Sequence, residues 1–141
     1  MQIQAYLFFD GRCEEAVEFY KKALGAKQGR LMRYQDCPEP PPPGMVPPGF
    51  ENKVMFTELQ VGENHLMACD DCTRAHTVFQ GFSLSLSVAN ETEAKRVFAA
   101  LAADGKIGMP LARTFFSPCF GMLKDRFGVG WMVIVPQPAN G

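Results

Sequence analysis

The sequence has almost no net charge and no long hydrophobic run. Fourteen Lys and Arg residues against fifteen Asp and Glu residues leave a formal charge of −1 over 141 residues. This balance argues against binding to nucleic acid or to an anionic membrane. No apolar stretch approaches the ~18 residues that a membrane helix needs, and the N-terminal segment lacks the basic start of a signal peptide. We therefore expect a cytoplasmic protein that folds as a single domain, residues 1–141.

The cysteines do not suggest a closed set of disulfides, because there are five of them. Cys69 and Cys72 have the spacing of a redox or zinc site, but no second pair of this kind completes a zinc site. The short polar segment after Cys72 is also unlike the helix that follows a thioredoxin-type motif. Reduced thiols at the end of a strand are the favoured interpretation, with redox or metal chemistry as the alternative. Cys119 could be a nucleophile, but no histidine lies near it in the sequence, which favours an inert role.

Two segments have the pattern of amphipathic helices. In residues 12–26, acidic residues come first, lysines come last and Gly25 ends the segment, as the helix dipole and the usual C-cap require. Its apolar stripe has helical spacing and consists of Ala16, Phe19, Tyr20, Ala23 and Leu24. The second helix begins at Asn90 as N-cap, with Glu93 at the third helical position. It is predicted to end at Asp104–Gly105.

The rest of the chain reads as strands and turns. Residues 82–88 alternate strictly between apolar side chains and serine, which is typical of a half-buried strand. Gly62 to Asn64 predict a hairpin turn, and Asp125 and Gly128 are interpreted as turn residues. The predicted strands span residues 3–9, 28–35, 53–61, 65–70, 82–88, 107–116, 121–124 and 130–135.

A proline-rich stretch, residues 36–50, separates the second predicted strand from the third. Proline lacks an N–H donor and disfavours helix, so this stretch is predicted to be a loop, partly polyproline II. A semi-rigid flap between two strands, with a possible role as a lid, is the favoured interpretation. A ligand for a proline-binding domain is the alternative.

The chain also repeats itself. A shift of 78 positions places Glu15 on Glu93, Tyr20 on Phe98 and Ala5 on Ser83. Two copies of strand–helix–strand–strand–strand then fill the length, as modules of about 1–78 and 79–141. Each half is too small for a robust core of its own, so the sequence predicts an α+β fold in which the two modules share a core.

Three segments carry a resemblance to a known family: YLFFDGRCEEAVEFYKKALGA, KVMFTELQVGENHLMACD and FGMLKDRFGVGWMV. With them the chain resembles the vicinal oxygen chelate superfamily of glyoxalases and bleomycin-resistance proteins, and within it the PhnB-like branch. The resemblance implies paired βαβββ modules whose curled mixed sheets form a cup with the helices outside, and a homodimer. Some members of this branch carry a methyltransferase label. Methyl transfer is not supported here, since no glycine-rich turn of the Rossmann type occurs.

Members of the superfamily with metal chemistry place ligands on the first and last strand of each module. In this chain, the resemblance puts those positions on Ala5, Ala68, Ser83 and Met132. Alanine offers no ligand atom, neutral serine is a poor ligand and methionine prefers soft metals. We therefore expect no metal and no other cofactor.

A displaced metal site is the alternative, with His65 and His76 and the carboxylates Glu58, Glu63, Asp70 and Asp71 as its candidate ligands. Strand alternation puts His65 on the face opposite Ala68, pointing away from the cup, and His76 lies in the connector between the modules. Glu58 shares a strand face with Phe56 and is a weak candidate for a catalytic base, with an exposed strand glutamate as the alternative.

The expected binding surface is the inner face of the sheets, where small residues leave room and larger apolar ones form walls. Its predicted residues are Ala5, Leu7, Phe56, Glu58, Ala68, Ser83, Ser85, Phe120, Met122, Trp131 and Met132. The favoured function is metal-free binding of a small organic molecule. The alternatives are a divalent-metal enzyme of the lyase, isomerase or dioxygenase class, and a protein-interaction module that uses the proline-rich loop.

Overall fold

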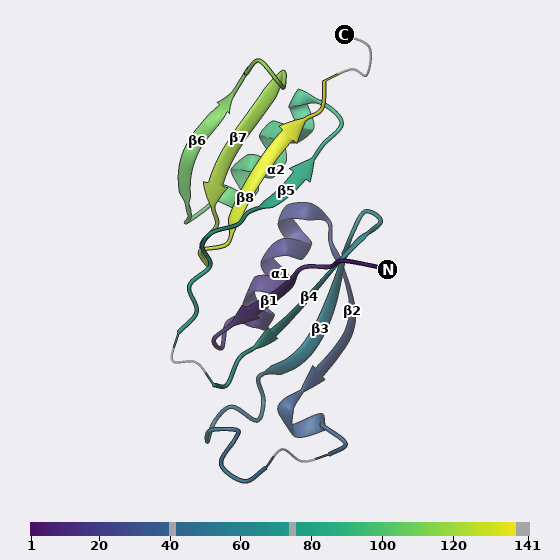
Figure 1. The fold of residues 1–141 in the computed structure, drawn as a ribbon, viewed down its shortest axis with the longest axis vertical. Helices are drawn as coiled ribbons and strands as arrows, with labels where there is room; N and C mark the ends of the chain where they lie inside the picture. Colours follow the sequence, from purple (N-terminus) through teal and green to yellow (C-terminus); the bar gives the residue numbers. More distant parts are fainter. Residues whose placement is uncertain (40–41, 74–75, 138–141) are drawn as a thin grey trace. The chain divides into compact units, whose positions relative to one another are not determined.

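The computed structural model describes residues 1–39, 42–73 and 76–137. Contacts between residues divide the chain into two compact units, Met1–Thr77 and Val78–Gly141. Each unit has one α-helix and one four-stranded mixed sheet that does not close into a barrel (Figure 1). The predicted α+β fold with two βαβββ modules is confirmed. Among the described residues, no helix combines the length and the apolar character needed to cross a membrane.

Unit 1 (Met1–Thr77) contains the first helix and four strands in the sheet order β1-β4-β3-β2. β1 runs parallel to β4, whereas β3 is antiparallel to both of its neighbours. The elements are β1 (Tyr6–Phe9), α1 (Cys13–Leu24), β2 (Lys27–Arg33), the short 3₁₀ helix η1 (Tyr34–Asp36), β3 (Val54–Val61) and β4 (Asn64–Asp70).

Unit 2 (Val78–Gly141) repeats this arrangement in the order β5-β8-β7-β6, again with the first and last strands parallel. Its elements are β5 (Leu84–Ser87), α2 (Glu91–Ala102), β6 (Lys106–Ala112), β7 (Cys119–Lys124) and β8 (Gly130–Val135). All eight predicted strands are present. The first, the fifth and the sixth are each three residues shorter than predicted, because pairing with a neighbour ends before the apolar pattern does.

The helix ends follow from local sequence. Gly25 takes a left-handed conformation (φ 67°) and its N–H donates to the Lys21 carbonyl at 3.0 Å, which closes the last turn of α1. The Asn90 side chain accepts a hydrogen bond from the Glu93 N–H at 2.9 Å, as predicted for the N-cap of α2. α2 ends at Ala102, two residues before the predicted stop.

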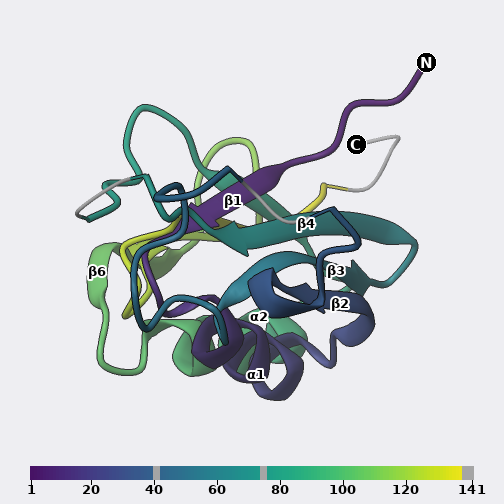
Figure 2. The same cartoon turned by 90° about the horizontal axis from the view of Figure 1, so that it is seen from below.

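Each helix covers one face of its own sheet and leaves the other face without a helix (Figure 2). In unit 1, α1 buries Cys13 and Val17 in addition to part of the predicted stripe, whereas Phe19 and Leu24 stay half-exposed. In unit 2, α2 buries Ala94, Val97, Phe98 and Leu101. A helix-free sheet face in each unit is therefore the place to look for a site.

The proline-rich segment connects β2 to β3 as a loop, as predicted; Pro40 and Pro41 lie outside the described residues. Its two ends are held together. The Gln35 N–H donates to the Glu51 carbonyl at 2.9 Å, and the Tyr34 N–H donates to the Lys53 carbonyl at 3.1 Å. The first and last residues of the loop therefore lie next to each other in unit 1.

Candidate functional site

The helix-free face of unit 1 presents aromatic side chains. Register pairing aligns Tyr6 of β1 with Met67 of β4, and Met67 with Glu58 of β3. Directly paired residues and every second residue along a strand share a face. We call this surface the open face of unit 1; it comprises Tyr6, Phe8, Phe56, Glu58, Met67 and Cys69.

Leu7 and Ala68 lie on the other face, which corrects their predicted place in the binding surface. They are only 2% and 4% exposed, and they share the α1 side of the sheet with Phe9 and Asp70. Ala5 lies before β1, where its carbonyl accepts a hydrogen bond from the Met67 N–H at 3.0 Å. In unit 1, alternation was recognised correctly but was assigned to the wrong face.

The reason is that the two modules place residues of opposite parity on the helix side of their sheets. The helices follow the shift of 78 from end to end, since Cys13 corresponds to Glu91 and Leu24 to Ala102. In β1 the odd-numbered residues are buried, whereas in β5 the odd-numbered residues are exposed. The strand bounds follow the same shift, and a shift of 78 keeps odd positions odd, so it places Ala5 and Leu7 on the wrong face.

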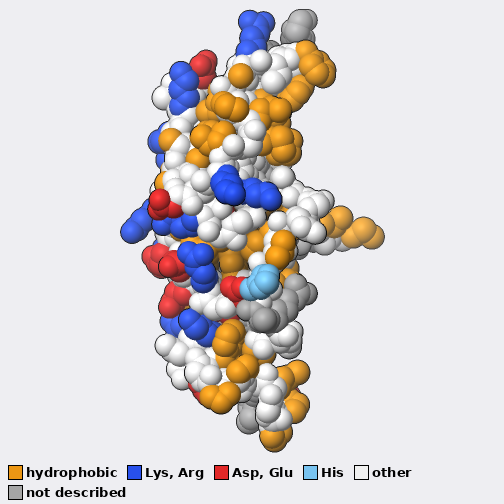
Figure 3. Space-filling view, turned by 90° about the vertical axis from the view of Figure 1, so that its left-hand side faces the viewer, with side chains coloured by type: hydrophobic (Ala, Val, Ile, Leu, Met, Phe, Trp, Pro, Cys, Tyr) orange, Lys and Arg blue, Asp and Glu red, His pale blue; other side chains and the backbone are white. Residues whose placement is uncertain are grey.

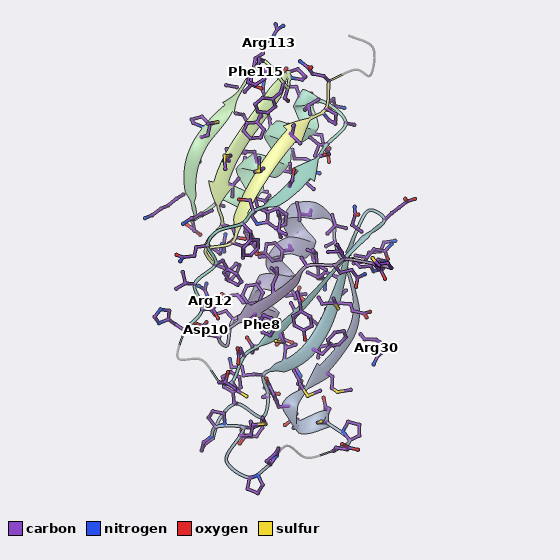
Figure 4. All side chains as sticks on the ribbon, viewed as in Figure 1. Phe8, Asp10, Arg12, Arg30, Arg113 and Phe115 are labelled. Carbon is purple, nitrogen blue, oxygen red and sulfur yellow. The ribbon has the colours of Figure 1, made fainter. Side chains whose placement is uncertain are left out.

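Three aromatic rings gather on the open face of unit 1. Tyr6 stacks on Phe8 with ring centroids 4.9 Å apart and planes at 27°, and Phe56 lies 6.2 Å from Tyr6 at 50°. Tyr6 remains 36% exposed and Phe8 40%; Figure 4 marks Phe8 on β1. Sequence reasoning missed Tyr6 and Phe8, although their alternation with Leu7 and Phe9 was a signal that two faces of β1 are apolar.

The polar atoms next to these rings are neutral. The Tyr6 hydroxyl and the Cys69 thiol share a hydrogen bond, and burial raises the pKa of Tyr6 to about 12 and that of Cys69 to about 11. At pH 7 both groups therefore keep their protons. A protonated phenol and a protonated thiol are poor metal ligands.

Glu58 is the one carboxylate on the open face of unit 1 as defined above. It is half-buried, follows Phe56 on the same strand face and has Gly29 of β2 beside it: a Cβ placed on Gly29 would lie 3.2 Å from Oε2 of Glu58. No hydrogen bond or ion pair joins its carboxylate to any residue that the structure describes. Arg30 is at the β2 edge of the sheet (Figure 4) and makes no ion pair with it.

His65 lies on the face opposite Ala68, as predicted, but this is the side of the sheet that carries Glu58 and not the side that points away from the binding surface. It pairs with Gln60, two residues after Glu58, and its side chain is exposed. His76 is exposed in the segment after β4, as predicted. Over residues 1–39, 42–73 and 76–137, no three His, Cys, Asp or Glu side chains group closely enough to hold a metal ion.

In unit 2, most predicted site residues share the helix-free face. Ser85 pairs with Met132, Met132 pairs with Met122, and Phe120 follows on the same strand face as Met122. We call this surface the open face of unit 2. Ser83 precedes β5 and, with Met122, lines a hollow of about 410 Å³.

Trp131 is the exception in unit 2, and its predicted place in the binding surface is wrong. It is 3% exposed and lies on the α2 side of the sheet, with Val133 two residues further along the strand. Its Nε1–H donates to Oδ2 of Asp125 at 2.9 Å. Asp125 also accepts from the Phe127 and Val129 N–H groups, so this turn is built around it, as predicted.

Cys119 lines a second hollow in unit 2, of about 590 Å³, together with Lys95 and Arg113. The thiol is buried, and this burial raises its pKa. No activating histidine lines the hollow. Cys119 therefore has the character of an inert side chain, as the sequence favoured.

Comparison with known proteins assigns a family. The family model described as 3-demethylubiquinone-9 3-methyltransferase matches residues 1–134. YjdN of Escherichia coli K12 is 33% identical over 149 aligned positions, which cover 99% of this chain and 100% of YjdN. Protein PA1353 of Pseudomonas aeruginosa is 40% identical, with a TM-score of 0.85 over 98% of this chain and 99% of its own. The PhnB protein of Bacillus cereus is 29% identical, with a TM-score of 0.80 over 96% and 99% of the two chains.

More distant structures share the fold alone. A glyoxylase/bleomycin resistance protein/dioxygenase domain from Frankia is 14% identical with a TM-score of 0.71 over 97% of this chain and 98% of its own. The fosfomycin resistance protein FosX of Listeria monocytogenes is 6% identical with a TM-score of 0.64 over 97% and 94%. The resemblance to the PhnB-like branch is confirmed by the Bacillus cereus structure, and the predicted glyoxalase-like fold is the fold of these distant structures.

Proposed function

The chain belongs to the family described as 3-demethylubiquinone-9 3-methyltransferase, and within its glyoxalase-like fold we propose that it binds a small organic molecule without a metal ion. The observation that carries this proposal is the open face of unit 1. Tyr6, Phe8 and Phe56 are partly exposed there and no helix covers them. Ligand sites are mostly apolar surfaces with a few well-placed polar groups, and Glu58 and the Tyr6–Cys69 pair are such groups.

The donors on the open faces support the metal-free part of the proposal. Unit 1 offers a protonated phenol, a protonated thiol, a thioether and Glu58; unit 2 offers Ser85 and Met132. Divalent ions are held in proteins by histidine, thiolate and carboxylate groups. Glu58 is the one member of this set with such a group, and a single carboxylate does not hold a divalent ion, so we assign no step to a metal.

The family description names methyl transfer, but the chain gives it no support. The turn between β1 and α1 contains a single glycine, Gly11, and the turn between β5 and α2 contains none. A nucleotide-type cofactor bound at a Rossmann turn needs several glycines for the close approach of backbone and ligand.

The proposal is tested by screening neutral and charged aromatic fragments against ¹⁵N-labelled protein. Amides of β1, β3 and β4 should shift in a saturable way for some fragments, and Phe8→Ala should weaken that binding. Phe115→Ala is the matched control, since Phe115 is 93% exposed in unit 2 and lies on neither open face as defined above. If no fragment shifts the strands of either sheet, or if Phe115→Ala weakens binding as much as Phe8→Ala, the proposal fails.

One observation favours the alternative of a divalent-metal enzyme. Glu58 and His65 lie on the same side of the first sheet, and a carboxylate and an imidazole are common metal ligands. Protein purified without a histidine tag should then hold a stoichiometric metal by elemental analysis and should lose it in Glu58→Gln. If protein prepared from metal-supplemented medium holds no metal, the metal-enzyme alternative is wrong and metal-free binding remains the proposed function.

We also propose that the protein is a cytoplasmic homodimer. The described part of unit 2 exposes six large apolar side chains: Val78, Phe82, Ile107, Met109, Phe115 and Phe116. Figure 3 shows hydrophobic side chains gathered over this unit. Exposed apolar patches commonly mark interfaces. All five cysteines are free, which suits a reducing compartment. Light scattering should give twice the mass of 15.6 kDa, and a monomer mass would refute the dimer.

A further inference from the structure

The open face of unit 1 combines aromatic rings with one unpaired negative charge. Glu58 has no hydrogen-bond or ion-pair partner in the described part of the chain, although it is half-buried beside Phe56 and Gly29. A carboxylate removed from water without a partner raises the free energy of the protein. A cation supplied by a ligand would offset that cost.

The aromatic rings favour the same kind of ligand. The face of an aromatic ring attracts a cation through its quadrupole, most strongly when the cation contacts more than one ring. Tyr6 and Phe56 are tilted by 50° with centroids 6.2 Å apart, and Phe8 extends the Tyr6 stack. They form an apolar surface of several ring planes, and Phe56 lies on the same strand as Glu58, two residues before it.

Among the described residues, no protein cation pairs with Glu58 on this surface. The neighbouring groups Cys69, Met67 and the Tyr6 hydroxyl are neutral. Arg30 lies at the β2 edge without an ion pair to Glu58 (Figure 4), and His65 is exposed further along β4, level with Gln60. The electrostatic character of the surface is therefore set by one carboxylate and three rings.

We infer that the open face of unit 1 selects organic cations, an amine or quaternary ammonium group carried on an apolar body, with Glu58 as the counter-charge and Tyr6, Phe8 and Phe56 as the walls. This inference rests on the proposed function and names the ligand class of the same surface. Organic anions are excluded by Glu58, and neutral molecules of the same shape bind more weakly.

The test uses three probes of one shape and three charges: choline, 3,3-dimethyl-1-butanol and 3,3-dimethylbutyrate. Each is titrated into the full-length ¹⁵N-labelled protein, and the amide shifts of β1, β3 and β4 are followed. Choline should bind about threefold or more tightly than the neutral alcohol, and the carboxylate should not bind. In Glu58→Gln, the preference for choline over the alcohol should shrink, because only the attraction of the rings remains, and the affinity of the alcohol should be unchanged. Glu63→Gln is the matched control, because it removes one charge from the exposed β3–β4 turn.

The outcomes separate the inference from the proposed function. If choline and the alcohol bind equally well to the strands of unit 1, or if Glu63→Gln weakens choline as much as Glu58→Gln does, selection for cations is wrong while binding of organic molecules stands. If choline, the alcohol and every aromatic fragment leave the open faces of both units unperturbed, the binding function itself is wrong. A Glu58→Gln protein that gives a dispersed native spectrum shows that its loss of choline binding is not unfolding.

Discussion

The Asp70 carboxylate accepts a hydrogen bond from the Cys13 N–H at 2.9 Å, and this contact joins the end of β4 to the first turn of α1. The same Oδ1 accepts from the Gly11 N–H at 2.8 Å, and Oδ2 accepts from the Val54 N–H at 3.1 Å. Asp70 is buried, so without its carboxylate these three N–H groups would have no water molecule to accept their hydrogen bonds. One side chain thereby holds β1, α1, β3 and β4 of unit 1 together.

Replacement of Asp70 should destabilise the protein strongly. In Asp70→Asn one acceptor oxygen remains, but the amide NH₂ faces a backbone N–H, so a buried donor loses its partner at a cost of about 1–3 kcal/mol. Asp70→Ala removes all three bonds and should cost more. Urea unfolding measures the change. The exposed Glu63→Gln serves as control, and equal midpoints for the wild type and Asp70→Asn would contradict this role.

Trp131 should matter for stability and not for ligand binding. Trp131→Phe keeps the ring in the core but removes the donor to Asp125, which should cost about 1 kcal/mol. Because Trp131 lies on the α2 side of its sheet, fragment binding to the open faces should be unchanged. If a folded Trp131→Phe protein loses fragment binding, Trp131 is part of the binding surface, and its assignment to the α2 side of the sheet is wrong.

Gly121 marks a close approach between β7 and α2. A Cβ at this position would lie 2.7 Å from Cε2 of Phe98 and 3.0 Å from the Met109 carbonyl oxygen. Gly121→Ala forces one of these groups to move and should cost about 1–3 kcal/mol. Gly108→Ala is the control, since its Cβ would come no nearer than 3.7 Å to any group outside its neighbours. Thermal unfolding should separate the two variants clearly; similar melting temperatures would contradict the packing described.

The buried thiols should weaken the fold at high pH. Burial raises the pKa of Cys69 from 9.0 to about 11 and raises that of Cys13 as well. Between about pH 9 and 11 the native state keeps the Cys69 proton while the unfolded chain releases it, so stability falls as the pH rises through this range. Below pH 9 both states are protonated and Cys69 contributes no pH dependence.

This effect is measured as the difference between urea midpoints at pH 8 and pH 10.5. The difference should be smaller in Cys69→Ala than in the wild type, because the variant lacks one titrating group. Cys37→Ala is the control, as Cys37 lies in the loop after η1 and is only partly buried. An equal drop for the wild type and Cys69→Ala would show that Cys69 does not titrate in this range.

Local patterns in the sequence were sufficient for most of the fold. The apolar stripe before Gly25 and the Asn90 cap predict both helices, because their spacing and end residues depend on neighbours within one or two turns. The alternation in residues 82–88 predicts β5 for the same reason. The repeat of 78 positions, which aligns α1 with α2 from end to end, predicts two like modules.

The residues that form the candidate site were harder to predict from the sequence than the fold. Glu58 and Phe56 were expected to share a face, and they do. The neutral Tyr6–Cys69 pair was missed, because strands that are distant in sequence bring these residues together. The same holds for Gly29 beside Glu58, which depends on the pairing of β2 with β3.

By itself, the sequence determined which segments are helix and strand, the twofold repeat and the alternation of each strand. Only the tertiary structure decided which face of each sheet the helix covers. Leu7 and Phe8 are both apolar, as are Trp131 and Met132, so composition does not distinguish their faces. Both strand-to-helix turns contain three residues, 10–12 and 88–90, so the length of the turn does not decide the face either. The face is set when the sheet and the helix pack together and bury one set of side chains, and this packing joins residues that are distant in sequence.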